Sequence, residues 1–360
     1  MSGAAAVSFA GVSKTYDGRT AVVDDLDLTV GEGEFLSLLG PSGSGKTTTL
    51  MMLAGFETPT AGEITLAGRS LAQVPAYRRD IGMVFQDYAL FPHMSVADNL
   101  AYPLRLRGLA REEIRARVDK ALAMINMSGF GQRLPAALSG GQRQRVAVAR
   151  ALIFAPRLVL MDEPLGALDR QLREQLQIEI KQLHRQLGLT IVYVTHDQAE
   201  ALTLSDRIAL FHQGRIEQLG TPRDLYERPD TPFVANFLGD NNLIRCMVAR
   251  SDGEDCQAKL PSGDLLAGKA AAGLTSGDKA VVAIRPEAIR LCANGQAATG
   301  EAEIIEAVYT GDQLRMRCRA FGIDTLQIKI SSADMPAQAA AGTRLRFSIA
   351  PEAVRVMADS

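Results

Sequence analysis

The chain has 360 residues, with 39 Lys and Arg against 41 Asp and Glu, and a formal net charge of −2. A single hydrophobic core rarely exceeds roughly 250–300 residues, so the length predicts two domains. Hydrophobic residues make up 47% of the chain, which excludes extensive disorder. Residues 1–239 carry 25 basic and 26 acidic side chains and residues 240–360 carry 14 and 15. Neither part has the basic surplus of a nucleic-acid binder, so we expect no nucleic-acid partner.

Segments for membrane insertion or secretion are not apparent. The sequence has no run of 18 apolar residues, and its N-terminus lacks a basic segment followed by an apolar core. The cysteines lie in the last third without close metal-type spacing, and we interpret them as small apolar strand residues in a reducing compartment. They are Cys246, Cys256, Cys292 and Cys318.

Short apolar runs alternate with helical periods through the first two-thirds of the chain. Continuous apolar runs are typical of buried parallel strands, and here they are residues 35–39, 158–161 and 191–194. Amphipathic stretches predict helices over residues 111–127, 142–154 and 169–187. Gly188 follows the last of these, where a helix often ends on a left-handed residue. This alternation predicts an α/β fold with a parallel sheet.

The pattern changes after about residue 238. Residues 239–242, Gly-Asp-Asn-Asn, indicate a break. Residues 314–319 and 343–349 alternate apolar with polar side chains, which predicts an antiparallel β domain built as a small barrel. Residues 284–291 also resemble residues 349–356, which indicates two related β modules in tandem.

Residues 40–47 match the phosphate-binding pattern G-x-x-x-x-G-K-[ST] between a predicted strand and a predicted helix. Glycines let backbone N–H groups turn towards phosphate oxygens, and the helix N-terminus favours their negative charge. Lys46 is expected to reach the β- and γ-phosphates, and the Thr47 hydroxyl to bind Mg²⁺. The expected ATP-binding residues of this segment are Ser42, Gly43, Ser44, Gly45, Lys46, Thr47 and Thr48.

A second predicted strand ends in two carboxylates. Asp162 stands at its tip, where it can hold the hydration shell of Mg²⁺, and Glu163 follows as the expected general base for an attacking water. Strands often end in acidic residues, so this pattern alone does not indicate a catalytic site. It does so only together with the phosphate loop in the same chain.

A third motif opens a helix 23 residues before Asp162, and it reads Leu138, Ser139, Gly140, Gly141 and Gln142. A hydroxyl and two glycines at a helix N-terminus make a second anion site. One nucleotide does not need two such sites at different ends of a domain. Two chains arranged head to tail do, because each then completes the site of the other.

The chain resembles the nucleotide-binding subunit of an ATP-binding cassette importer. In that family residues 138–142 are the signature motif, which acts on the nucleotide of the partner chain. The resemblance implies a nucleotide-binding domain over residues 1–238, with a helical subdomain at about 94–155, and a regulatory, OB-like β-barrel domain of the TOBE type over residues 239–360.

Further site residues follow from this resemblance. Tyr16 matches the aromatic that stacks on adenine, and Gln86 matches the glutamine that senses Mg²⁺ and the lytic water. Leu168 and Asp169 belong to a loop, residues 165–169, that crosses the dimer interface. His196 matches the histidine that contacts the γ-phosphate, and it also follows a buried strand that is expected to end at the same sheet edge as Asp162.

The expected function is ATP hydrolysis, with ATP and Mg²⁺ as cofactors, by a homodimer on the cytoplasmic face of the inner membrane. Its implied partners are two integral-membrane permease subunits and, indirectly, an extracytoplasmic solute-binding protein. Residues 161–169 and 195–202 look most like the spermidine/putrescine subgroup, with sugar, ferric-iron and sulfate importers as close relatives. The β domain senses a solute or a regulatory protein, or it only holds the dimer together; the sequence leaves both open.

Other P-loop proteins fit less well. A kinase or a switch GTPase does not need the signature motif, and the N-K-x-D motif of a GTPase is absent. A DNA-repair or chromosome ATPase inserts a long coiled coil between the phosphate loop and the signature, where this chain has about 90 residues. A translation-factor cassette protein carries two cassettes in one chain.

Overall fold

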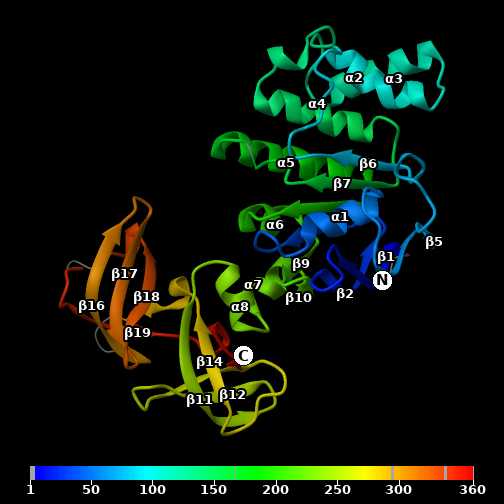
Figure 1. Cartoon of the computed structure of the whole chain (residues 1–360). Helices are drawn as coiled ribbons and strands as arrows, with labels where there is room; N and C mark the ends of the chain where they lie inside the picture. Colours follow the sequence, from blue (N-terminus) through cyan, green and yellow to red (C-terminus); the bar gives the residue numbers. More distant parts are fainter. Residues whose placement is uncertain (1–4, 167, 293–295, 336–338, 360) are drawn as a thin grey trace. The chain divides into compact units, whose positions relative to one another are not determined.

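A computed structural model of the protein describes residues 5–166, 168–292, 296–335 and 339–359 (Figure 1). Ala167, which belongs to the loop expected at the dimer interface, lies outside this set. The chain divides into two compact units, Met1–Pro222 and Arg223–Ser360. No helix in the described ranges combines the length and the apolar character needed to cross a membrane.

A six-stranded sheet in the order β10-β9-β3-β8-β7-β6 forms the centre of the first unit. Its strands are β3 (Phe35–Leu39), β6 (Ile81–Val84), β7 (Leu158–Asp162), β8 (Ile191–Thr195), β9 (Arg207–His212) and β10 (Arg215–Gly220). All except β10 run parallel, and every residue of β3, β7 and β8 is buried. The α/β fold expected from the continuous apolar runs is therefore confirmed, and the carboxyl ends of β3, β8, β7 and β6 meet at one edge.

A second, antiparallel sheet has the order β2-β1-β4-β5. Its strands are β1 (Ala5–Thr15), β2 (Ala21–Gly31), β4 (Ala61–Leu66) and β5 (Arg69–Ser70). One hydrophobic cluster joins both sheets to helix α1 (Lys46–Ala54) and includes Phe9, Leu38 and Leu50. Burying such a side chain stabilises the fold by about 1.5–3 kcal/mol. This packing holds the N-terminus of α1 at the carboxyl end of β3.

Three helices form a subdomain with a core of its own: α2 (Val96–Leu106), α3 (Arg111–Met124) and α4 (Gly140–Leu152). One side of α4 contributes Val146 to this core, whereas Val148 packs with β7 and with α5 (Arg170–Leu187). Because α4 belongs to both clusters, it joins the subdomain to the main sheet. Among the residues that the structure describes, this unit also has α6 (Gln198–Leu204) and two 3-10 turns, Ala76–Arg78 and Pro135–Ala137.

Helix ends differ from the sequence prediction where a local hydrogen bond decides them. α4 begins at Gly140 rather than at Gln142, because Ser139 and Gln142 form a reciprocal capping box. α5 begins at Arg170, because Asp169 caps it by accepting a hydrogen bond from Leu172 N. It ends at Gly188 with φ +60°, as predicted.

The second unit contains two short helices, a closed barrel and an open sheet. The helices are α7 (Pro222–Glu227) and α8 (Pro232–Phe237). The barrel consists of β11 (Asn242–Asp252), β12 (Asp255–Lys259), β13 (Leu265–Ala270), β14 (Lys279–Ile284) and β20 (Val354–Ala358). The open sheet consists of β15 (Arg290–Leu291), β16 (Gly300–Tyr309), β17 (Gln313–Ala320), β18 (Ile323–Ser331) and β19 (Arg344–Ser348). The predicted β-rich second domain is therefore confirmed.

The boundary between the units lies after Pro222, earlier than the predicted residue 238. α7 and α8 belong to the β unit because they pack on it. Ala235 joins a small hydrophobic cluster with Ala283 and Met357, and Arg285 donates a hydrogen bond of 3.1 Å to the carbonyl of Tyr226. These contacts join residues far apart in sequence, so composition did not indicate them.

The internal repeat occupies two equivalent crossings between the barrel and the open sheet. In the first copy, a 3-10 turn at Pro286–Ala288 follows β14 of the barrel and leads to β15 of the sheet. In the second, a turn at Pro351–Ala353 follows β19 of the sheet and leads to β20 of the barrel. The two modules are therefore interlocked rather than strictly consecutive.

The cysteines are free thiols on or beside strands of the second unit. Cys246, Cys256 and Cys318 are buried, and Cys292 is half-buried. Burial raises the pKa of Cys246 and of Cys318 to about 11, as expected for inert core residues.

Candidate nucleotide-binding site

The segment after β3 has the backbone that a phosphate loop requires. Gly40 and Gly45 have φ of +152° and +102°. A side chain on Gly40 would lie 2.3 Å from the Phe211 carbonyl oxygen, and one on Gly45 would lie 2.5 Å from that of Val22. Only glycine fits such contacts. Gly45 is also the N-cap of α1, so the helix begins directly at the loop.

Lys46 lies inside this loop. Its Nζ donates hydrogen bonds of 2.9 Å and 2.8 Å to the carbonyls of Gly40 and Pro41, and the side chain is almost wholly buried. Burial lowers the pKa of Lys46, although the negative charges of Glu163 and Asp162 act in the opposite direction. A buried ammonium beside a helix N-terminus is a strong site for a polyphosphate.

Thr47 and Asp162 meet across the gap between α1 and β7. The Thr47 hydroxyl donates to Asp162 Oδ1 at 3.2 Å. Burial raises the pKa of Asp162, and the hydrogen bond from Thr47 lowers it. A hydroxyl and a carboxylate are hard oxygen ligands of the kind that Mg²⁺ prefers, so these two residues fit the ion.

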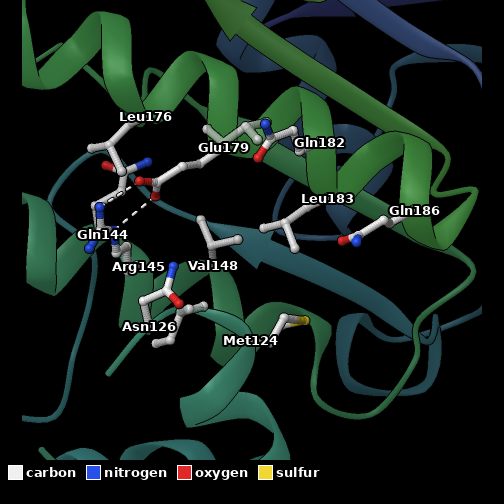
Figure 2. A pocket seen from close by; sticks show the side chains of 12 residues that line it. Met124, Asn126, Gln144, Arg145, Val148, Leu176, Glu179, Gln182, Leu183 and Gln186 are labelled. Carbon is white, nitrogen blue, oxygen red and sulfur yellow. Dashed lines mark hydrogen bonds and ion pairs between the residues drawn. The ribbon is translucent and has the colours of Figure 1, made fainter. Parts of the chain in front are cut away.

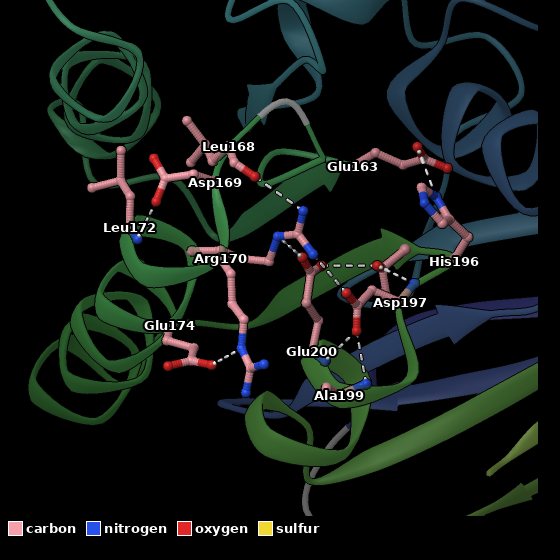
Figure 3. A network of polar contacts seen from close by, with 12 residues as sticks. Glu163, Leu168, Asp169, Arg170, Leu172, Glu174, His196, Asp197, Ala199 and Glu200 are labelled. Atoms are coloured by element: carbon pink, nitrogen blue, oxygen red, sulfur yellow. Dashed lines mark hydrogen bonds and ion pairs between the residues drawn. The ribbon is translucent and has the colours of Figure 1, made fainter. Parts of the chain in front are cut away.

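Glu163 and His196 follow the neighbouring strands β7 and β8 and form a pair. Glu163 Oε2 lies 3.1 Å from His196 Nδ1 (Figure 3). The backbone of Glu163 is held by a hydrogen bond to the Val194 carbonyl and has φ of +43°, which is uncommon for a side chain of this size. Strained backbone of this kind gathers at functional sites.

Gln86 follows β6, which pairs with β7, so it lies at the same edge of the sheet and its side chain is exposed. The turn that follows Gln86 is held in place by hydrogen bonds from Arg150, a residue of α4. Arg150 donates to the carbonyls of Tyr88 and Ala89 at 3.0 Å and 2.7 Å. Sequence reasoning missed Arg150, because nothing in its local pattern marks a contact 61 residues away.

Tyr16 lies in the turn between β1 and β2 and is 62% exposed. Its ring contacts the Lys14 ammonium at 4.8 Å. The strand after this turn reaches the phosphate loop, since the Val22 carbonyl lies against Gly45. Tyr16 thus precedes the strand that reaches the phosphate loop, and an exposed aromatic ring suits stacking on a base.

The signature segment packs on the loop that follows β7. A side chain on Gly140 would lie 3.1 Å from Leu168 Cδ2, and one on Gly141 would lie 2.9 Å from the methyl groups of Leu172. The glycines of this segment contact Leu168 and Leu172, which follow β7, whereas the phosphate loop follows β3, two strand positions or about 10 Å away.

A small cavity of about 100 Å³ lies between α4 and α5 beside the end of α3 (Figure 2). The Arg145 guanidinium on α4 donates through two nitrogens to Glu179 on α5 at its edge. The Gln144 side-chain amide also faces the cavity, buried and without a hydrogen-bond partner. The ion pair fastens the signature helix to α5.

Taken together, the phosphate loop, the Thr47–Asp162 contact and the buried parallel sheet define a P-loop nucleotide-binding ATPase. The family described as "ABC transporter" matches residues 23–166, and the "TOBE domain" family matches residues 282–357. The chain is 49% identical to the spermidine/putrescine import ATP-binding protein PotA of Rubrobacter xylanophilus, over 88% of this chain and 84% of that protein. It is 47% identical to the Fe(3+) ions import ATP-binding protein FbpC 1 of Rhizobium meliloti, over 86% of each.

A solved dimeric structure of the ATP-binding cassette MJ0796 with ADP and Pi is 36% identical to the chain. It matches with a TM-score of 0.55 over 60% of this chain and 99% of its own. The chain therefore belongs to the family of ATP-binding subunits of ABC importers, and it is a nucleotide-binding ATPase.

Proposed function

We propose that two copies of the chain close around two ATP molecules, hydrolyse them at sites that both copies build, and so energise the import of a polyamine. The observation that carries the catalytic part is the contact between Glu163 and His196 at the sheet edge that also holds Lys46 and Asp162. Asp162 and Glu163 stand at the end of β7, His196 follows β8, and Lys46 begins α1 after β3.

In this proposal the phosphate loop binds the triphosphate of its own chain and Tyr16 stacks on the adenine. Lys46 leaves its loop carbonyls for the β- and γ-phosphates. Thr47 and Asp162 would hold Mg²⁺, with Gln86 at the same edge, and the ion would neutralise charge on the phosphates. Glu163 takes the proton of the attacking water, and His196 holds the γ-phosphate beside it.

The other half of each site comes from the partner copy. Ser139 and its two glycines begin a helix, and such an N-terminus binds anions. Because this helix end packs on the segment after β7 and not on the phosphate loop of its own chain, we propose that it serves a nucleotide held by another copy. The dimer in the solved cassette structure supports this arrangement.

A heterodimer tests the shared site. One chain carries Ser139→Arg and the other Lys46→Ala, and two affinity tags select the mixed dimer. One complete site then remains, and we expect ATPase activity well above that of either mutant homodimer. In the matched control, a chain with both changes pairs with an unchanged chain and leaves no complete site. Equal activity in the two mixed dimers would contradict shared sites.

We further propose that the dimer works on the cytoplasmic face of the inner membrane. Two integral-membrane permease subunits are its direct partners, and an extracytoplasmic solute-binding protein delivers the solute to them. A polyamine is supported by the names of the relatives that match at 49–52% identity. Ferric iron is the second candidate, because a relative named for iron import is 47% identical.

Uptake distinguishes the two cargoes. Cells in which the gene is deleted are assayed for uptake of radiolabelled spermidine, putrescine and ferric iron, with and without the restored gene. We expect the deletion strain to lose uptake of spermidine and putrescine and the restored gene to recover it. Uptake of ferric iron should be the same in both strains. Unchanged polyamine uptake with lost iron uptake would replace the proposed cargo and leave the ATPase mechanism intact.

A further inference from the structure

Arg173 connects two loops at the carboxyl ends of β7 and β8, the sheet edge at which Glu163 and His196 lie (called the catalytic edge below). It lies in the first turn of α5, and its guanidinium donates hydrogen bonds of 3.0 Å to the Leu168 carbonyl and 2.9 Å to Asp197 Oδ2. Leu168 belongs to the loop after β7, and Asp197 directly follows His196. One side chain therefore spans the expected dimer-interface loop and the histidine loop.

The same guanidinium faces a buried carboxylate. Arg173 Nε lies 3.8 Å from Glu200 Oε1, and Glu200 is only 2% exposed. The other oxygen of Glu200 accepts hydrogen bonds from Tyr193 at 2.7 Å and from Thr195 at 2.8 Å, both on β8. A buried carboxylate requires such partners, so the network is held firmly to the sheet.

This network fixes the backbone on both sides of His196. Thr195 Oγ1 accepts a hydrogen bond of 2.9 Å from Asp197 N, and Asp197 Oδ1 accepts one of 2.8 Å from Ala199 N at the start of α6. The His196 side chain is more than half exposed and contacts Glu163. The network thus fixes the backbone from which the His196 side chain projects, and it leaves the exposed part of the imidazole ring open to a ligand.

The other end of the network reaches the signature segment. Leu168 packs against Gly140, and Leu172 packs against Gly141. The Arg145–Glu179 ion pair fastens α4 to α5 (Figure 2). The signature helix, the interface loop and the first turn of α5 are therefore packed together, and Arg173 links them to the histidine.

We propose that Arg173 is a positioning residue that links the Leu168 backbone to Asp197 and thereby holds His196 in contact with Glu163. The inference rests on the proposed function, which gives those two residues their catalytic roles. An arginine suits this task because its planar fork donates in several fixed directions, whereas a lysine cannot bridge the same acceptors.

Kinetics test the coupling. We expect Arg173→Ala to lower kcat for ATP hydrolysis by about tenfold or more while KM for ATP stays within about threefold, since misplacement by about 1 Å can cost about 10²-fold. Arg173→Lys should unfold at nearly the wild-type temperature, because it keeps a charge beside Glu200, yet show a similar loss of kcat. Arg117→Ala, which breaks the exposed pair with Glu113, is the matched control and should leave kcat unchanged.

Histidine NMR reads the position of His196 independently of activity. The chain has four histidines, so ¹³C-labelled histidine gives few signals, and His196→Ala identifies the relevant one. We expect Arg173→Lys and Arg173→Ala to shift or broaden the His196 signal and to leave that of His93 unchanged. An unmoved His196 signal in a folded Arg173→Lys protein overturns the proposal. If the signal moves but His196→Ala keeps full ATPase activity, the positioning role stands and the proposed catalytic role of His196 fails.

Discussion

Thr47 and Asp162 stand 115 residues apart in the sequence, and a hydrogen bond of 3.2 Å joins them. The contact places the first turn of α1 against the tip of β7, so the phosphate loop and the acidic strand end face one space. Burial raises the pKa of the Asp162 carboxyl, which means that the fold disfavours its charge. A cation bound there would reverse this penalty.

Asp162→Asn tests the role of this contact in Mg²⁺ binding. The amide keeps the size of the side chain and a hydrogen-bond partner for Thr47, but it removes the charge. We expect the Mg²⁺ concentration for half-maximal ATPase activity to rise by about 10- to 100-fold, as for other partners that act through a metal-bound water. Thermal unfolding of the nucleotide-free variant should occur at or above the wild-type temperature. An unchanged Mg²⁺ requirement would contradict the assignment.

Glu163→Gln separates binding from hydrolysis. The amide cannot accept the proton of the attacking water, so we expect the rate of phosphate release to fall by about 10²–10⁴-fold while ATP affinity is retained. Calorimetry measures the affinity, and a phosphate assay measures the rate. Glu217→Gln is the control, because Glu217 also faces a histidine, His212 at 3.8 Å, but on β10. Full ATPase activity in pure Glu163→Gln protein would remove Glu163 from its proposed role.

The burial of Lys46, which lowers its pKa, leads us to expect that ATP binding depends on pH. Burial lowers its pKa, and a bound triphosphate raises it again. At alkaline pH, above the lowered value, part of the Lys46 population is neutral and must take up a proton when ATP binds. ATP affinity should therefore decline as the pH rises through that range, and Lys46 should take up no proton on ATP binding at neutral pH.

Calorimetry in two alkaline buffers with different ionisation enthalpies measures this proton uptake. The free energy of unfolding of the nucleotide-free protein should also increase as the pH rises from the folded-state pKa of Lys46 to its unfolded-state pKa. In that interval the unfolded chain binds more protons than the folded protein. Lys46→Met should abolish that pH-dependent gain in stability. Proton uptake that persists in a Lys46→Met protein still able to bind ATP would assign the proton to another group.

Local patterns in the sequence were sufficient for the main fold and for most of the candidate site. Continuous apolar runs predicted β3, β7 and β8 because strands buried on both faces need them. The phosphate loop was found by its motif and Glu163 by its place after a buried strand, whereas His196 was assigned from the family resemblance and from its place after β8. Their convergence follows from parallel strands, whose carboxyl ends meet at one edge.

Contacts between distant segments decided the rest. Nothing near Arg173 in the sequence indicates Asp197, 24 residues away, and nothing near Arg150 indicates the turn after Gln86. The assignment of α7 and α8 to the β unit and the interlocking of the two repeat copies also depend on such packing. The sequence by itself determined which elements form and which residues can carry phosphate chemistry, because those depend on neighbours along the chain. Only the tertiary structure decided which side chains hold the catalytic edge in place, because a hydrogen bond across 24 or 61 residues leaves no local pattern.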